Sequence, residues 1–211
     1  MDEEALAWLW CFFGRKGSHY LVDVGAGNGE SGSLSRGFLT EREWKGLLID
    51  PLPLHVKALK KLYERNPLVK VLDCAVMPCS GSGPLWPFRE VSTTRLAWAK
   101  ACEGWWKHVN YSPALKVVYR KLDDILEEEE APLIVDFLKL DTEGRDLEIL
   151  KSLQGDRIFR VICVEVLDMV HRPESGGWKP SEDLLSFMEV KGYSLELVTK
   201  AGNAIFQRRE G

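Results

Sequence analysis

One short segment, Asp23 to Gly29, combines an acidic side chain with three glycines at alternate positions. Glycine tolerates backbone angles that other residues avoid, and it lets a ligand approach the main chain closely. Dinucleotide sites favour the spacing GxGxxG, in which a pyrophosphate lies on a helix N-terminus, whereas this chain has GxGxG with an acid two residues before it. Because Asp23 would repel a diphosphate, the segment favours a cationic nucleoside such as S-adenosylmethionine. The predicted contacts are Asp23, Gly25, Ala26, Gly27, Asn28 and Gly29, although such a loop taken alone is also explained as a tight turn.

Two further acids, Asp50 and Asp73, each follow a short apolar run. Asp50 lies roughly 20 residues beyond the glycine loop, where an acidic residue accepts the ribose hydroxyls in nucleotide sites. The carboxylate of Asp73 and the backbone of Cys74 could read the amino group and ring nitrogen of adenine. Each aspartate alone is equally well explained as a turn former. Acids at the ends of three successive strands predict a nucleoside site, to which we also assign Pro51 and Ala75.

The elements that must position these residues follow from the pattern of apolar residues. Short apolar runs alternate with segments of helical period, which is typical of a parallel sheet covered by helices on both faces. A terminal antiparallel hairpin is predicted to complete a seven-stranded sheet. The predicted strands are 19–24, 45–49, 69–72, 133–140 and 160–166, and the hairpin comprises 193–198 and 204–207.

Helices are predicted between these strands from their apolar stripes and capping residues. Residues 52–65 form one, a second runs around Leu147 to Leu153, and a third begins at the cap Ser181 and ends before Gly192. The glycine loop is predicted to lead directly into another helix, which contains Leu34, Phe38 and Leu39.

The segment between the third and fourth predicted strands is long for a simple crossover. It contains a turn-rich run at 80–84 followed by several tryptophans. We interpret about 77–115 as an insertion beside the ligand site, within a single domain of residues 1–211. A further edge strand is predicted at 116–120.

The composition and net charge of the chain restrict the kinds of binding partner that can be predicted. With 45% hydrophobic and 28% charged residues, the chain resembles ordinary globular proteins. A formal net charge of -4 gives no general attraction to phosphate backbones or anionic membranes, so neither nucleic acid nor membrane is a predicted partner. The apolar stretch 5–13 follows three acidic residues and is too short to span a bilayer. Five scattered cysteines without a CxxC pair indicate reduced thiols and a cytoplasmic protein.

Five segments, in order, resemble the FkbM family of methyltransferases within the Rossmann-like methyltransferase superfamily. The resemblance extends over most of the chain from Tyr20 to Leu153. Asp50 stands where the family often has glutamate, which should preserve ribose binding, and the tryptophan-rich insertion has no counterpart that we can assign. The matching segments are the glycine segment 23–29, Ile49-Asp50-Pro51, Cys74-Ala75-Val76, Leu122-Asp123-Asp124-Ile125-Leu126 and Phe137-Leu138-Lys139-Leu140-Asp141-Thr142-Glu143-Gly144.

This resemblance implies an α/β, Rossmann-like methyltransferase fold. Its seven-stranded, mostly parallel sheet would have the order 3-2-1-4-5-7-6 with helices on both faces. The ligand would lie at the carboxyl ends of strands one to four, as open α/β sheets also require, with Asp141 facing the methyl donor. The implied activity is methyl transfer from S-adenosylmethionine. Because the Asn/Asp-Pro-Pro-Tyr segment of many amino-methyltransferases is absent at the fourth strand, we favour O-methylation of a hydroxyl on a small molecule or sugar.

A neutral hydroxyl would be helped by a general base that removes its proton as the new bond forms. Asp141 and Glu143 are the leading candidates, followed by Glu165 at the end of the fifth strand and His171 in the next loop. Glu143 is equally well explained as a first-turn acid favoured by the helix dipole, and His171 as an ordinary loop residue. The three acids could hold a divalent cation, but no ligand motif fixes their geometry, so no metal is predicted.

Three alternatives remain open at the level of sequence. N-methylation of a peptide or small molecule is compatible with the same family. A non-catalytic module could keep the S-adenosylmethionine pocket and act through its tryptophan-rich insertion. A nicotinamide-dependent oxidoreductase is disfavoured by the glycine spacing and by Asp23. Binding of S-adenosylhomocysteine or of NADH would discriminate the last of these.

Overall fold

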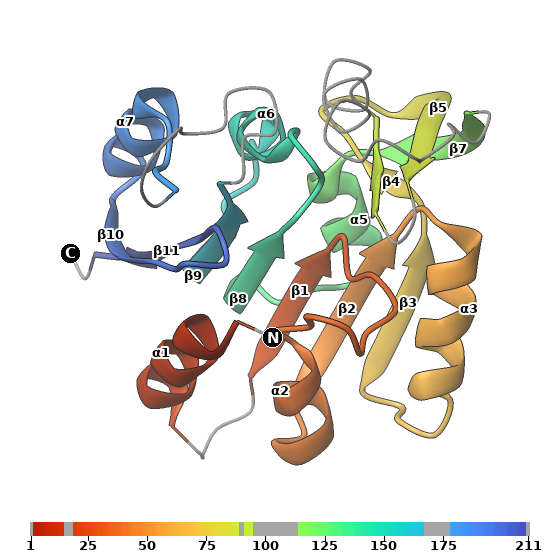
Figure 1. Cartoon of the computed structure of the whole chain (residues 1–211), viewed down its shortest axis with the longest axis horizontal. Helices are drawn as coiled ribbons and strands as arrows, with labels where there is room; N and C mark the ends of the chain where they lie inside the picture. Colours follow the sequence, from red (N-terminus) through yellow and green to blue (C-terminus); the bar gives the residue numbers. More distant parts are fainter. Residues whose placement is uncertain (1, 15–18, 89–90, 95–113, 167–177, 210–211) are drawn as a thin grey trace.

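A seven-stranded sheet forms the centre of the computed structural model, which describes residues 2–14, 19–88, 91–94, 114–166 and 178–209. Its order is β10-β11-β9-β8-β1-β2-β3 (Figure 1). Counted along the chain, this is the predicted order 3-2-1-4-5-7-6. Only β11 runs antiparallel to its two neighbours. The strands are β1 (Tyr20–Val24), β2 (Lys45–Asp50), β3 (Val69–Asp73), β8 (Ile134–Leu140), β9 (Ile158–Glu165), β10 (Tyr193–Val198) and β11 (Asn203–Arg208).

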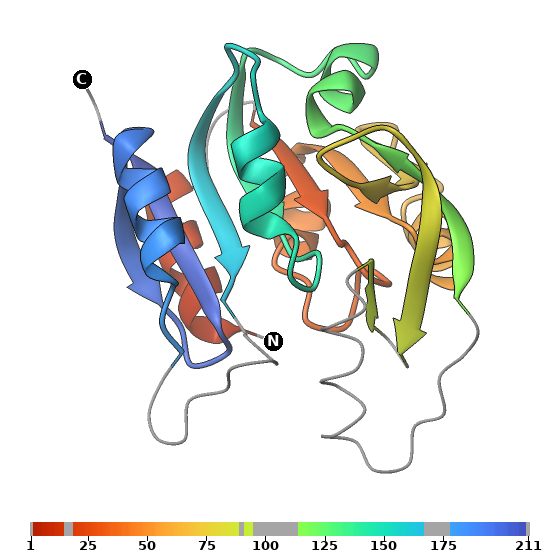
Figure 2. The same ribbon diagram turned by 90° about the horizontal axis from the view of Figure 1, so that it is seen from above.

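Helices cover both faces of this sheet, as predicted. One apolar core joins α1, α2 and α3 to one face, and a second joins α5, α6 and α7 to the other. Figure 2 shows α1 and α7 on opposite sides of the sheet. The helices are α1 (Glu3–Phe13), α2 (Arg36–Glu41), α3 (Pro53–Leu62), α5 (Leu122–Glu128), α6 (Asp146–Ser152) and α7 (Glu182–Val190).

Local chemistry explains where several helices begin. The Asp2 side chain accepts the Ala5 backbone N–H and so caps α1. In the same way the Ser181 hydroxyl accepts the N–H of Leu184, which confirms the predicted cap of α7. A proline at the first position of α3 has no N–H to leave unsatisfied. Among the described residues, no helix is long and apolar enough to cross a membrane.

Two features differ from the sequence prediction. The helix after the glycine loop is short and begins only at Arg36, so Leu34 lies in the loop. The segment after β3 also builds a second, four-stranded sheet in the order β4-β7-β5-β6. The predicted edge strand at 116–120 belongs to this second sheet, because it pairs with two of these strands and not with the central sheet. The additional strands are β4 (Ala75–Val76), β5 (Gly81–Phe88), β6 (Val91–Thr93) and β7 (Leu115–Arg120).

Candidate functional site

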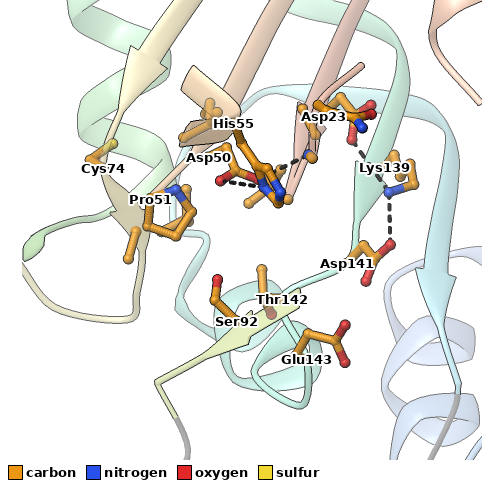
Figure 3. Close-up of a pocket in the computed structure, with 18 of the residues that line it drawn as sticks. Asp23, Asp50, Pro51, His55, Cys74, Ser92, Lys139, Asp141, Thr142 and Glu143 are labelled. Carbon is orange, nitrogen blue, oxygen red and sulfur yellow. Dashed lines mark hydrogen bonds and ion pairs between the residues drawn. The ribbon is translucent and has the colours of Figure 1, made fainter. Parts of the chain in front are cut away.

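A cavity of about 300 Å³ opens where β1, β2 and β8 end, and the second sheet forms one of its walls. Figure 3 shows acidic side chains from several strand ends gathered around it. This is the edge of the sheet at which the sequence predicted the ligand. Its lining includes Asp23, Gly25, Ala26, Gly27, Asn28, Asp50, Pro51, His55, Cys74, Ala75, Ser92, Thr94, Lys139, Asp141, Thr142 and Glu143.

The glycine loop can bend as it does because Gly25 lies directly against the end of β8. Gly25 has a φ of +80°, and a Cβ built on it would lie 1.9 Å from the backbone oxygen of Asp141. No side chain fits in that space. The backbone N–H groups of Gly25 and Ala26 both donate to the Ile49 carbonyl, at 2.9 and 3.2 Å, so the loop is also fixed to β2.

The rest of the loop is shaped by Asn28 and Gly29. The Asn28 side-chain oxygen accepts the N–H groups of Glu30 and Ser31, at 2.9 and 2.8 Å, which closes a local turn beside the cavity. Gly29 was predicted as a ligand contact, but it is outside the cavity lining. A Cβ at this position would lie 2.6 Å from the Leu59 side chain, so this glycine lets the loop pack on α3.

Asp50 ties the end of β2 to the glycine loop. One carboxylate oxygen, Oδ2, accepts the N–H of Gly27 at 2.9 Å. The other, Oδ1, accepts the N–H of Leu52 at 2.9 Å and lies 3.2 Å from His55 Nδ1. The carboxylate is buried at the cavity wall, which is the position that the ribose prediction requires.

On the side predicted for adenine, the structure separates two residues that the sequence had grouped. Cys74 and Ala75 line the cavity, whereas the Asp73 side chain is exposed and outside the lining. Side chains of consecutive residues in extended backbone point to opposite sides, so Asp73 points away when Cys74 faces inward. Of the three residues predicted to contact adenine, Cys74 and Ala75 are therefore the two that line the cavity.

Lys139 is a buried cation in the middle of this site. Its Nζ lies 3.0 Å from Asp141 Oδ2 and 3.5 Å from Asp23 Oδ1 (Figure 3). Burial opposes the charged form, but the carboxylates of Asp141 and Asp23 raise the pKa of Lys139 above its ordinary value. The lysine is therefore charged and partly neutralises two of the acids.

Three of the predicted catalytic acids meet at one point. Asp141, Glu143 and Glu165 each present an oxygen, and these oxygens all lie within 4.8 Å of one another. Burial raises the pKa of both Glu143 and Glu165 well above the ordinary value, and the neighbouring charge of Asp141 raises both further. Glu143 lines the cavity, whereas Glu165 is outside the lining. The fourth candidate, His171, lies outside the described residues.

Asp146, at the start of α6, makes the stability of the folded protein depend on pH. Its buried carboxylate accepts both the N–H and the hydroxyl of Thr142, at 3.0 and 2.8 Å. Burial, followed by the charge of Asp141, raises its pKa from 3.8 to about 6. The folded state therefore binds the proton more tightly than the unfolded state. Stability contributed by protonated Asp146 is lost as pH rises from about 4 to about 6, by an amount on the order of 3 kcal/mol.

The Asp146→Asn variant keeps the acceptor oxygen but cannot titrate. We expect its unfolding free energy, measured by urea denaturation at pH 5.0 and 7.5, to change less with pH than that of the wild type. Some dependence should persist because the pKa values of Glu143 and Glu165 are raised as well. Asp156→Asn, a change at an exposed carboxylate, should keep the full dependence. An identical pH response in wild type and Asp146→Asn would contradict this assignment.

Several lining residues were missed by the sequence analysis. Ser92 and Thr94 reach the cavity from the second sheet, and the Thr93 hydroxyl donates to the Glu143 carbonyl at 2.9 Å. No local pattern marks these residues. Lys139 did carry a signal, because a lone cation within the apolar strand β8 must have buried anionic partners. His55 carried no signal in the sequence apart from its position five residues after Asp50.

The residues at this site fit S-adenosylmethionine. Asp23 is almost fully buried at the cavity, and its Oδ1 accepts no hydrogen bond from the described residues. This oxygen shares an ion pair with Lys139 at 3.5 Å, and because it accepts no hydrogen bond from the described residues it is suited to accept one from a ligand ammonium. At Gly27, which lines the cavity, a Cβ would meet nothing within 4 Å, so the bare backbone leaves room for a close approach. Asp50 offers a carboxylate where a ribose would be bound.

The fold of the described residues is that of the Rossmann-like methyltransferases. The structure resembles a methyltransferase FkbM from Methylobacillus flagellatus KT with a TM-score of 0.52 and 18% identity, covering 90% of this chain and 43% of that one. It also resembles the N-terminal domain of human METTL16 with a TM-score of 0.51 and 15% identity, covering 98% of this chain and 69% of that one. At these identities the likeness concerns the fold alone. A search of curated proteins gave no match.

The sequence itself identifies the family. The model of the methyltransferase FkbM domain matches residues 23–195, which include the glycine loop, all six predicted acids of the site and most of the central sheet. The chain therefore belongs to the FkbM methyltransferase family, as the sequence motifs predicted. It spans less than half the length of the Methylobacillus flagellatus protein.

Proposed function

We propose that this chain transfers the methyl group of S-adenosylmethionine to a hydroxyl of a small molecule or sugar. The observation that carries the proposal is the surplus of carboxyl groups beside the glycine loop. Asp23, Asp141 and Glu143 line this end of the cavity, and Lys139 is the cation in contact with the first two. Such a site favours a ligand whose reacting end is positively charged.

Each part of the cavity has a role in this proposal. Asp23 binds the ammonium of the methionine portion, Asp50 binds the ribose, and the backbone at Cys74 and Ala75 borders the adenine. S-adenosylmethionine supplies an electrophilic methyl group on a sulfonium. Positioning of the acceptor in line with that group would then provide most of the rate, so that no covalent bond to the protein is needed.

The reaction also requires a base that removes the proton of the acceptor hydroxyl, and we propose Glu143 for this role. It lines the cavity, and burial raises its pKa well above that of an ordinary carboxyl group, which makes the carboxylate a stronger proton acceptor. Burial also raises the pKa of Glu165, and this neighbouring carboxyl group can share the proton that Glu143 takes up. The role of Asp141 in this proposal is to hold Lys139 through their ion pair, in addition to facing the acceptor.

Binding provides the first test. Wild-type protein should bind S-adenosylhomocysteine in a calorimetric titration, and Asp50→Ala should weaken binding by roughly a hundredfold, because charge-assisted hydrogen bonds and the anchor of the glycine loop are lost together. Asp73→Ala is the matched control: it also removes a carboxylate from a strand end, but outside the cavity, so affinity should be unchanged. A folded wild type without affinity for S-adenosylhomocysteine would exclude the proposal.

Transfer provides the second test. Incubation with S-adenosylmethionine and panels of hydroxylated small molecules, sugars, amines and oligonucleotides should yield a product heavier by one methyl group. Methylation of an amine or nucleic acid would replace the proposed acceptor class while keeping the donor. Tight binding of the donor without product from any panel would favour the non-catalytic module. The small-molecule partner and the cytoplasmic location are likewise part of what we propose.

A further inference from the structure

The proposed function leaves the carboxylate of the methionine portion without a partner. S-adenosylmethionine ends in an α-amino acid, whose ammonium we have placed at Asp23, and its carboxylate also loses water when it enters the cavity. Among the described lining residues, Lys139 is the one lysine or arginine. It is already held by the carboxylates of Asp23 and Asp141 (Figure 3). The ligand carboxylate therefore needs uncharged hydrogen-bond donors, because a buried charge without partners is costly.

Several uncharged donors of the lining are already used within the protein. The backbone N–H groups of Gly25, Ala26 and Gly27 all donate to acceptors at the end of β2. At the end of β8, the N–H and the hydroxyl of Thr142 both donate to Asp146. These groups could bind a ligand only by breaking the bonds that hold the two strand ends in place.

The segment Ser31-Gly32-Ser33, which also lines the cavity, supplies open donors. A Cβ built on Gly32 would meet nothing within 4 Å, so the backbone here borders open space. Within the described part of the chain, neither the N–H groups of Gly32 and Ser33 nor the hydroxyl hydrogens of Ser31 and Ser33 have an acceptor. Ser33 Oγ accepts the N–H of Arg36 at 3.2 Å, which holds the oxygen in place and leaves its hydrogen to donate elsewhere.

Asp23 places this segment beside the ammonium site. The Ser35 hydroxyl donates to Asp23 Oδ2 at 2.6 Å, whereas Oδ1 accepts no hydrogen bond from the described residues. Ser33 precedes Ser35 by two residues, and two residues of chain span at most about 7 Å. The ammonium and the carboxylate of an α-amino acid are bonded to the same carbon atom. A ligand whose ammonium meets Asp23 Oδ1 therefore brings its carboxylate to the part of the cavity that this segment lines.

We infer that Ser31-Gly32-Ser33 binds the carboxylate of the methionine portion, through the N–H groups of Gly32 and Ser33 and the hydroxyls of the two serines. The inference rests on the proposed binding of S-adenosylmethionine. It gives the two charges of the amino acid separate partners: the Asp23 carboxylate binds the ammonium, and uncharged donors bind the carboxylate. The site thereby selects a nucleoside that carries a complete amino acid over one that carries an amine alone.

Removal of the ligand carboxylate tests this assignment. We would titrate S-adenosylhomocysteine and its decarboxylated analogue, which keeps the amine, into wild type, Ser33→Ala and Ser33→Asp. Wild type should bind the analogue at least roughly tenfold more weakly, because hydrogen bonds to a charged group are lost. In Ser33→Ala, S-adenosylhomocysteine should lose roughly three- to tenfold in affinity while the analogue is unaffected, so the difference between the two ligands narrows. Ser33→Asp keeps an acceptor for the N–H of Arg36 but would repel the ligand carboxylate, so this variant should prefer the analogue.

The matched control is Ser181→Ala. Ser181 Oγ accepts the N–H of Leu184 at 3.2 Å, as Ser33 Oγ does for Arg36, but Ser181 is outside the cavity lining. This variant should lose similar stability and bind both ligands as the wild type does. Equal binding of the two ligands by wild type, or an unchanged ratio of their affinities in both Ser33 variants, would overturn the inference while leaving donor binding intact. Failure of S-adenosylhomocysteine to bind wild type would instead reject the proposed function.

Discussion

Gly25→Ala is expected to lose about 3 kcal/mol of unfolding free energy and all measurable affinity for S-adenosylhomocysteine. Two costs combine. A positive φ is unfavourable for alanine, and the new Cβ would overlap the Asp141 carbonyl oxygen, which must move. That oxygen belongs to the backbone at the end of β8, so relief of the overlap would separate β1 from β8 at the cavity floor. Chemical denaturation and calorimetric titration measure the two losses.

Gly192→Ala separates the two costs. Gly192 also has a positive φ, of +83°, but a Cβ there meets nothing within 4 Å and lies far from the cavity, after α7. This variant should lose only about 1 kcal/mol and should bind S-adenosylhomocysteine normally. If Gly25→Ala were no less stable than Gly192→Ala and still bound the ligand, the close approach of β1 and β8 would not matter for the site.

Lys139→Met is expected to have the second large effect. It would leave Asp23 and Asp141 without their buried cation, and removal of one partner from a buried ion pair costs about 3–5 kcal/mol. The neighbouring carboxylates raise the pKa of the lysine above 10.5, so its contribution is complete at neutral pH and is lost only as pH rises beyond that value. The loss should therefore be seen in full by urea denaturation at pH 7.5.

Lys200→Met is the control for a surface pair. Lys200 Nζ lies 3.7 Å from Glu4, but this lysine side chain is 94% exposed, and such pairs contribute little. Its stability should stay within about 0.5 kcal/mol of the wild type. A Lys139→Met protein as stable as Lys200→Met would mean that the carboxyl groups of the site lose their charge when the lysine is removed.

The strands of the central sheet show how much of the fold can be predicted from local sequence. All seven strands of the central sheet were predicted within two residues of their observed ends, because buried strands are continuous apolar runs and their boundaries are marked by turn residues. By contrast, the predicted start of α2 was wrong. Asp23 accepts the Ser35 hydroxyl at 2.6 Å, which holds the loop in place over a longer path before the helix begins. That contact joins residues from two elements and leaves no periodic trace.

The sequence by itself determined the family, the strand order and the placement of Asp23, Asp50 and Asp141, since the carboxyl ends of parallel strands meet at one edge whatever packs around them. Only the tertiary structure decided which side chains turn toward the cavity. It brought Glu165 to Glu143, set the second sheet against the loop after β8, and turned Asp73 outward. These outcomes depend on the direction of individual side chains and on contacts between segments distant along the chain. Neither is encoded in the local pattern of residue types.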